Sequence, residues 1–158
     1  MCLAVYIASD HALPTMAYDP ARPAFYVEDA TDCPVHNPLR AHFRQPFLYA
    51  AGPHSGCGCG FEFDGFYNDD GEYEARDLPE QVASRRGLAD FLSAALHHQA
   101  EVEVLTCCSG DESAPPKHRR RARPADFILD RTLFRFGELV VVSEQDAEPV
   151  STAERPRG

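Results

Sequence analysis

The sequence predicts a single α+β domain in which a mixed or antiparallel sheet of about five strands carries one principal helix on a face. Two observations lead to this fold class. Short runs of apolar residues alternate with segments rich in proline and glycine, which is typical of strands and turns. One long segment shows clear helical periodicity. With 158 residues, of which 44% are hydrophobic, the chain can bury the core of one domain, which we expect over residues 1–142.

Three strands are predicted in the first part of the chain. Leu3–Ala8 alternates branched apolar residues with small or amphipathic ones, which indicates a buried strand. Phe25–Glu28 lies between proline-containing segments and is predicted to be a short strand near an edge. Phe47–Ala51 is the third strand, and we expect the turn at 52–56 to reverse it into a hairpin with 57–63.

The principal helix is predicted between Pro79 and His98, and Ser84 is an alternative N-cap for a later start. Its apolar residues follow the spacing of one helix face: Leu88, Phe91, Leu92, Ala95 and Leu96. A strand over Glu101–Cys107 follows at once. We therefore expect a crossover that packs the helix on one face of the sheet.

The last part of the chain is predicted to contain one strand, Glu138–Val142, because three consecutive valines favour a buried, pleated environment. Residues 110–124 are rich in proline and charge and are expected to form a mobile loop. The pattern of apolar residues over 127–136 does not indicate which secondary structure this segment forms. Residues 143–158 are polar and contain prolines, so we expect a disordered tail.

Charge and hydropathy exclude several classes of protein. Fifteen basic residues against 25 acidic residues give a net charge of -10, which disfavours binding to nucleic acid or to an anionic membrane. No apolar run approaches the roughly 20 residues of a spanning helix, and the first residues lack the basic region of a signal peptide. We expect a cytoplasmic protein whose six cysteines stay reduced and serve in metal binding, thiol chemistry or packing.

The most informative stretch is the turn with His54, Cys57 and Cys59, where four of the ten glycines of the chain lie between residues 52 and 60. Thiolate and imidazole are ligands of zinc, and copper and iron sites use the same donors. A closed zinc site needs a fourth ligand, for which we expect Cys108 at the end of the next strand. The sequence thus predicts a zinc site with a structural or regulatory role.

Other interpretations of the cysteines stay open. The fourth ligand could instead be Cys107 or the pair Cys33 and His36. Cys57 and Cys59 are also explained as small core residues of a glycine-rich hairpin. A thiol-dependent enzyme or redox protein would use one of these two cysteines or Cys108, with His54 activating the sulfur.

The charged segments offer a function of another class, a module that docks a protein partner. Acidic residues are concentrated over 62–80, and five of the fifteen basic residues lie within 117–123. The basic run is either a solvated loop or a contact for phosphate groups. In the first case it would pair with the surrounding acidic residues.

The start of the chain, Met1-Cys2 followed by a strand, resembles the class II glutamine amidotransferases. Leu3 and Ala4 replace the glycine and isoleucine that usually follow the cysteine of that family. The resemblance implies an N-terminal nucleophile whose own amine acts as the base. The alternative is that Cys2 only begins the first strand.

Overall fold

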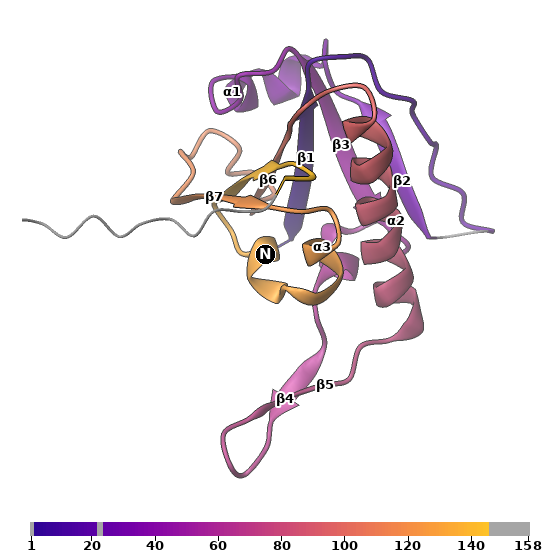
Figure 1. The fold of residues 1–158 in the computed structure, drawn as a ribbon, viewed down its shortest axis with the longest axis vertical. Coiled ribbons are helices and arrows are strands. Elements are labelled where there is room, and N and C mark those ends of the chain that lie inside the picture. The colour runs from indigo at the N-terminus through magenta and orange to yellow at the C-terminus, as the bar shows by residue number, and fades with distance from the viewer. Residues whose placement is uncertain (1, 22–23, 146–158) are drawn as a thin grey trace, which may run out of the picture.

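The structure is a computed structural model, and it describes residues 2–21 and 24–145 (Figure 1). Its strands are β1 (Leu3–Ser9), β2 (Phe25–Asp29), β3 (Phe47–Pro53), β4 (Gly65–Tyr67), β5 (Tyr73–Ala75), β6 (Val102–Cys108), β7 (His118–Ala122) and β8 (Glu138–Val142). Its helices are α1 (Asn37–Arg40), α2 (Pro79–Leu96) and α3 (Asp126–Leu129), with short 3-10 helices η1 (Pro34–His36), η2 (Gly58–Phe61) and η3 (Arg131–Phe134).

Six of the strands form one mixed sheet in the order β2-β3-β1-β6-β8-β7. Neighbouring strands are antiparallel, except that β7 runs parallel to β8. The predicted α+β class with a mixed sheet is confirmed, with six strands where about five were expected. β2 lies at one edge, as its sequence predicts.

Helix α2 crosses one face of the sheet beside α3, which confirms the predicted packing (Figure 1). Val5 and Ile7 of β1 point to this face and share a buried core with Leu88 of α2. The alternation of side chains along a strand sends Tyr6 to the opposite face, where it packs in a second core with Leu39 of α1. β1 is therefore buried on both faces.

Helix α2 starts at the earlier of the two predicted positions. Pro79 occupies the first turn, where a backbone N–H would have no hydrogen-bond partner within the helix. The side-chain oxygen of Gln81 accepts a hydrogen bond from the N–H of Leu78 at 2.9 Å, which caps the start. Ser84 lies inside the helix, and its hydroxyl donates to the carbonyl of Glu80.

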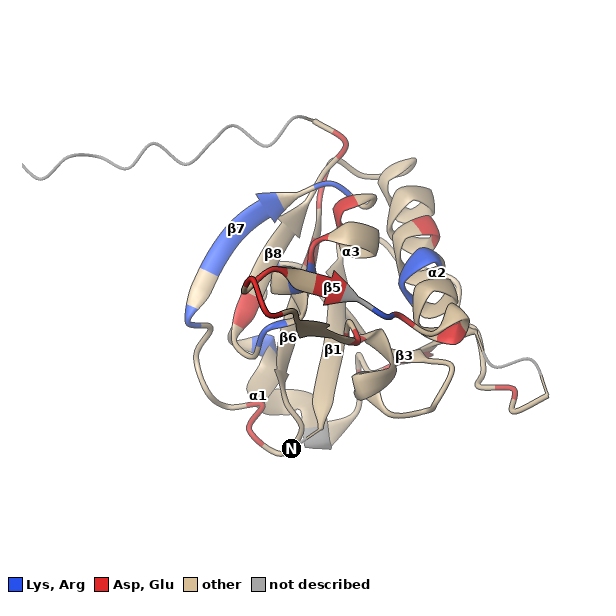
Figure 2. Ribbon diagram, turned by 90° about the horizontal axis from the view of Figure 1, so that it is seen from below, with Lys and Arg blue, Asp and Glu red and all other residues tan. Residues whose placement is uncertain are grey.

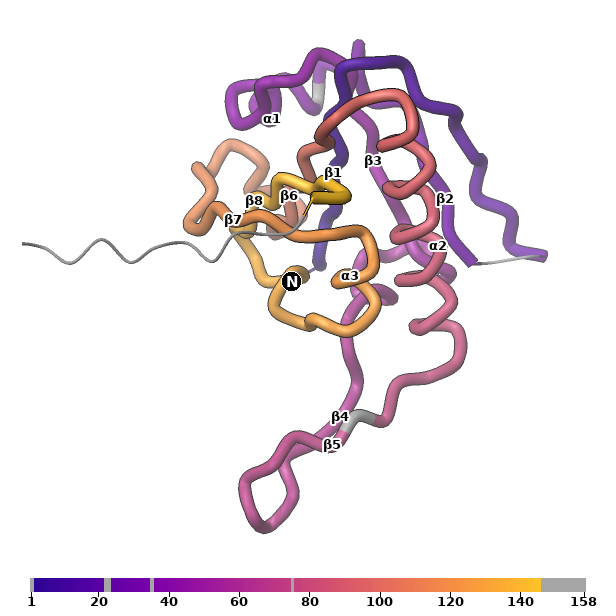
Figure 3. The backbone as a smooth tube through the Cα atoms, in the orientation of Figure 1, coloured from indigo at the N-terminus to yellow at the C-terminus, as the bar shows by residue number. Residues whose placement is uncertain are grey.

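The predicted hairpin between 47–51 and 57–63 is wrong. β3 pairs with β1 on one side and with β2 on the other, so it has no edge left for a further strand. After β3 the chain turns into η2, beside the start of β1 (Figure 3). Phe61 of η2 is fully buried between Phe25 and Phe134, with ring centroids 6.2 and 5.7 Å away. The segment is therefore stabilised by burial of the Phe61 ring and not by pairing with β3.

Strands also form in the acidic segment 62–80 and in the segment 110–124, which was expected to be a mobile loop. In the acidic segment, β4 and β5 pair as a two-stranded ribbon that projects from the domain (Figure 1). In the segment 110–124, β7 forms an edge of the sheet, where its basic residues stand out in Figure 2. Arg120 of β7 forms ion pairs with Asp130 and Glu138 at 3.3 and 2.7 Å. Charged side chains on an edge strand also hinder pairing with other chains.

The C-terminal part of the fold resolves what the sequence left open. Residues 127–136 include most of α3 and all of η3, around the fully buried Phe127. β8 ends at Val142, as predicted. The tail predicted over 143–158 lies outside the described residues from 146 onward. In the part of the chain that is described, no helix has both the length and the apolar character needed to cross a membrane.

Candidate metal centre

Three cysteine sulfurs converge at one end of the sheet. Cys2 precedes β1, Cys57 precedes η2 and Cys59 lies within η2. Their sulfur atoms all lie within 4.8 Å of one another. Among residues 2–21 and 24–145, this is the one group of three or more histidine, cysteine or carboxylate ligands that meets this distance.

A close approach of two backbones creates this group. A Cβ atom on residue 58 would lie 1.9 Å from the carbonyl oxygen of Leu3 and 2.6 Å from its carbonyl carbon. No side chain can occupy that position, so Gly58 is required for η2 to rest against the first residue of β1. The two cysteines on either side of Gly58 are thereby brought to Cys2, which precedes Leu3.

Hydrogen bonds hold the turn that leads into η2. The N–H of Gly56 donates to the carbonyl of Pro53 at 3.0 Å. The hydroxyl of Tyr26 donates to the carbonyl of Gly56, and the hydroxyl of Tyr18 to that of His54, both at 3.3 Å. The turn is therefore tied to the edge strand and to the segment before it, which favours one arrangement of the cysteines.

His54 is anchored to helix α2 and is not a member of the group of three. The Oγ of Ser84 donates its single proton to the carbonyl of Glu80. The same oxygen must therefore accept from the N–H of His54 at 3.0 Å and from its Nδ1 at 2.8 Å. In this arrangement Nδ1 carries the ring proton and Nε2 is left as the acceptor. This is how second-sphere bonds commonly orient a metal-binding imidazole.

Cys108 and Cys107 end β6 and point to opposite faces of the sheet. Cys108 pairs with Leu3 in the β1–β6 register and is half-buried, yet it does not belong to the group of three. Cys107 is buried among the residues of the second core. Burial, together with the nearby charge of Glu112, raises the pKa of the Cys107 thiol to about 12. Cys107 is thus a packing residue.

The second predicted pair lies elsewhere. Cys33 precedes η1 and His36 ends it, on the face of the sheet opposite to α2. The ring of His36 contacts that of Tyr6 edge to face, with centroids 5.2 Å apart. Neither residue is in the group of three.

A small cavity opens beside the sulfurs. Its volume is about 280 Å³, and Cys2 and Cys57 both line it. Its other walls come from β1, β2, β3, the turn before η2, the first residue of η2 and the residue after β6. They contain no charged side chain: Leu3, Ala4, Val5, Tyr6, Tyr26, Ala50, Ala51, Gly56, Gly58 and Ser109. Two of the three potential ligands therefore border a cavity that has no charged side chain in its walls.

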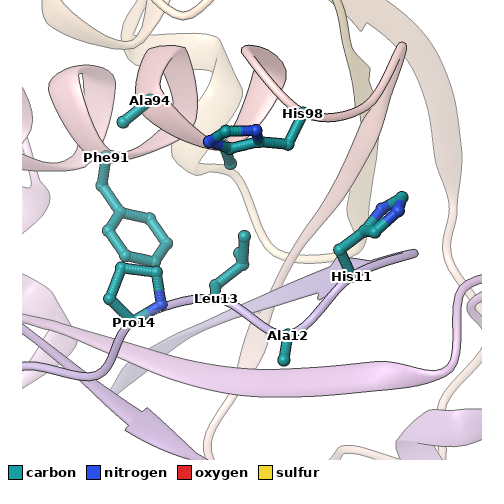
Figure 4. Close-up of a pocket in the computed structure, with 8 residues that line it drawn as sticks. His11, Ala12, Leu13, Pro14, Phe91, Ala94 and His98 are labelled. Carbon is teal, nitrogen blue, oxygen red and sulfur yellow. The ribbon is translucent and has the colours of Figure 1, made fainter.

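A larger cavity, of about 490 Å³, lies between helix α2 and the segment after β1 (Figure 4). Phe91 and Leu13 form apolar walls, while His98 lies above Leu13 in this view and His11 lies to the right. No cysteine or carboxylate lines it. Its two histidines are fewer than the three protein ligands that a zinc site commonly has.

Sequence reasoning placed Cys57 and Cys59 together but missed Cys2 as their partner. The available signal was Gly58 between the two cysteines, because glycine permits a close approach of another backbone. Which backbone would approach is a property of the tertiary fold. His54 and Cys108 stay predictions as fourth ligands.

Comparison with known proteins gives no match to a protein family, to a curated protein or to a solved structure. The resemblance of Met1-Cys2 to the class II glutamine amidotransferases is thus not joined by a family match.

Proposed function

We propose that this chain is a metal-binding protein that holds a zinc ion through the thiolates of Cys2, Cys57 and Cys59. The observation that carries the proposal is the convergence of three sulfurs within 4.8 Å. With Zn–S bonds of about 2.3 Å, the sulfurs of a tetrahedral site lie about 3.8 Å apart. Small side-chain rotations would therefore bring the three ligands to bonding distance.

The exposure of these cysteines supports metal binding over packing. A free cysteine that serves packing is buried, as Cys107 is at 6% exposure. Cys2 is exposed, and Cys57 and Cys59 are half-buried. Three thiols that gather at the surface gain little from apolar contact, whereas each can bind an ion as a thiolate.

The donor set favours zinc or copper(I) over an iron–sulfur cluster, and of these two ions we propose zinc. Iron–sulfur clusters usually take four cysteines, one more than this group supplies. Copper(I) accepts thiolates as readily as zinc does and remains the competing ion. The two buried cores form without the three cysteines, so the proposed role of the ion is regulatory rather than essential for folding. Binding through free thiolates also fits a reducing compartment such as the cytoplasm.

The interaction module receives less support from the contacts of the basic strand. Arg120 is paired with Asp130 and Glu138, and Arg121 is paired with Glu101. These charges are already compensated within the chain, which corresponds to the solvated interpretation of the basic run. A protein partner of the metal site remains compatible with the proposal.

Elemental analysis of untagged protein, purified without chelator, tests the proposed function. We expect one zinc per chain in the wild type and loss of this zinc in Cys2→Ser, Cys57→Ser and Cys59→Ser. Cys33→Ser is the matched control, because Cys33 is also half-buried but lies outside the group. Absence of metal after incubation with zinc, or equal zinc content in the wild type and Cys57→Ser, would overturn the proposal. Stoichiometric copper in place of zinc would overturn the choice of ion.

A further inference from the structure

The three-sulfur group leaves one position of a tetrahedral ion without a ligand from its own members. We infer that a small, uncharged thiol from outside the chain fills this position from the cavity beside Cys2 and Cys57. The inference rests on the proposed function, because it requires a bound metal. The inference names the chemical class of the fourth ligand, which the three cysteines alone do not define.

The first support is the placement of the side chains that could otherwise close the site. The backbone N–H and Nδ1 of His54 are both bonded to Ser84 Oγ, so moving the imidazole to the sulfurs would strain or break these bonds. Cys108 is fixed in the β1–β6 ladder, and its thiol donates to the carbonyl of Ser109 at 3.7 Å. Neither side chain lies within 4.8 Å of all three sulfurs. Zinc sites with three protein ligands keep the fourth position for water or a small ligand.

The second support is the position and size of the cavity. Cys2 and Cys57 line it directly, so a molecule inside it lies next to two of the metal ligands. Its volume of about 280 Å³ lies just below the usual range for drug-sized ligands, about 300 to 1,000 Å³. The cavity therefore suits a ligand of a few heavy atoms.

The third support is the chemistry of the cavity walls. No lysine, arginine or histidine lines the cavity, so its walls offer an anion such as phosphate no charged partner. Tyr6 and Tyr26 are among the residues that line it, and their hydroxyls donate to Glu112 and to the carbonyl of Gly56. Their oxygens retain lone pairs for a hydroxyl or amide group of a ligand. A neutral, polar small molecule that carries a soft donor atom matches these walls.

A sulfur donor fits the ion better than an oxygen or nitrogen donor. A metal already held by three thiolates is a soft centre, and soft centres prefer a further sulfur. If the ion is bound, the incoming thiol would release its proton to solvent and its sulfur would take the place of a water ligand. No oxidant or reductant is consumed.

Cobalt(II) substitution with 2-mercaptoethanol as the probe tests the inference. Sulfur-to-cobalt charge-transfer absorption in the near ultraviolet reports the number of Co–S bonds. We expect bands of a three-sulfur site in the protein alone, and a rise of about one third when 2-mercaptoethanol adds a fourth sulfur. Imidazole, a nitrogen donor of similar size, is expected to give no such rise at equal concentration.

Ala50→Phe is the variant that separates the cavity from the metal ligands. Ala50 lines the cavity from β3 without belonging to the group of three, so the larger side chain should keep the bands and abolish the response to thiol. Ala4→Phe fills the same cavity from β1 and serves as a second variant if the first does not fold. An undiminished response in a folded variant of either kind would overturn the inference.

The outcomes for wild-type protein distinguish failure of the proposed metal site from failure of the thiol ligand. If no charge-transfer band appears with cobalt, the proposed function itself fails. If the band appears but 2-mercaptoethanol leaves it unchanged, the metal site stands and the thiol ligand is wrong. A thiol response that is gained only in His54→Ala would show that His54 closes the site in the wild type, which also overturns the inference.

Discussion

Gly58 lies so close to Leu3 that the carbonyl oxygen of Leu3 occupies the space of a side chain at residue 58. A Cβ atom there would be 1.9 Å from that oxygen and 3.3 Å from the Cβ of Leu3 itself. The contact joins η2 to the first residue of β1. It therefore decides whether Cys57 and Cys59 reach Cys2.

Gly58→Ala is expected to separate the sulfurs without removing any of them. The added methyl group must push η2 away from the strand, at a cost of about 1 to 3 kcal/mol in the free energy of unfolding. We expect the affinity for zinc to fall at least tenfold. Competition with a chromophoric chelator measures the affinity, and urea unfolding measures the stability.

Gly71→Ala is the control for that substitution. Gly71 has a φ of +79°, and nothing lies within 4 Å of the position that an alanine methyl group would take, so alanine there strains the backbone far from the cysteines. Stability should fall by about 1 kcal/mol, while zinc affinity should stay at the wild-type value. An equal loss of affinity in both variants would contradict the role of the Gly58 contact.

Alkylation by iodoacetamide should divide five of the six cysteines into three groups. In metal-free protein at pH 8, we expect Cys2, Cys57 and Cys59 to react, because they are exposed or half-buried. Zinc should protect these three and leave the half-buried Cys33 unprotected. Cys107 should not react in either state, because its thiol is buried and its pKa is raised to about 12. Mass spectrometry of the labelled peptides checks each group, and early labelling of Cys107 would contradict the packing assignment.

A buried ion pair near η2 should contribute much more to stability than a surface pair. Arg85 of α2 is 1% exposed and bonds Asp77 at 2.5 Å and the carbonyl of Glu62 at 3.0 Å. Asp77→Ala leaves the buried guanidinium without its carboxylate, which should cost about 3 to 5 kcal/mol. Urea unfolding measures the loss. Glu101→Ala removes the partner of the half-exposed Arg121, and its cost should stay below about 1 kcal/mol.

The sequence predicted those elements whose burial is encoded locally. β1, β3, β6, β8 and α2 carry apolar residues at the period of their own structure, so a single segment suffices to identify each. β7 has no such pattern, since four of its five residues are histidine or arginine. It becomes a strand because it pairs with β8 and because its arginines form ion pairs with acidic residues outside the strand, such as the pair of Arg120 with Asp130.

The candidate site was predictable only in part for the same reason. The spacing of Cys57 and Cys59 within one turn is local, and the sequence identified both. The approach of Cys2 depends on the tertiary contact of Leu3 with Gly58, and the separation of His54 depends on its bond to Ser84. The hairpin was wrong because burial of Phe61 outweighs strand pairing in a segment rich in glycine.

Asp130 should give the protein a measurable dependence of stability on acid pH. Although burial opposes it, hydrogen bonds from Thr132 and the charge of Arg120 hold the pKa of the Asp130 carboxyl below its usual value. The folded chain therefore binds its proton less readily than the unfolded chain does. The resulting stabilisation is complete above the unfolded pKa, about 3.9, and is lost as the pH falls through the lower folded pKa.

Asp130→Asn isolates this contribution. Asp130 also caps η3 by accepting from the N–H of Thr132 at 2.8 Å, so the substitution should cost about 1 kcal/mol at pH 7. The difference in unfolding free energy between wild type and variant should shrink as the pH falls from 5 to 2, because the wild-type carboxylate becomes protonated. Asp69→Asn, in the exposed turn of the β4–β5 ribbon, should show neither effect. Urea unfolding across this pH range measures both, and a difference that stays constant with pH would show that the carboxylate charge contributes nothing.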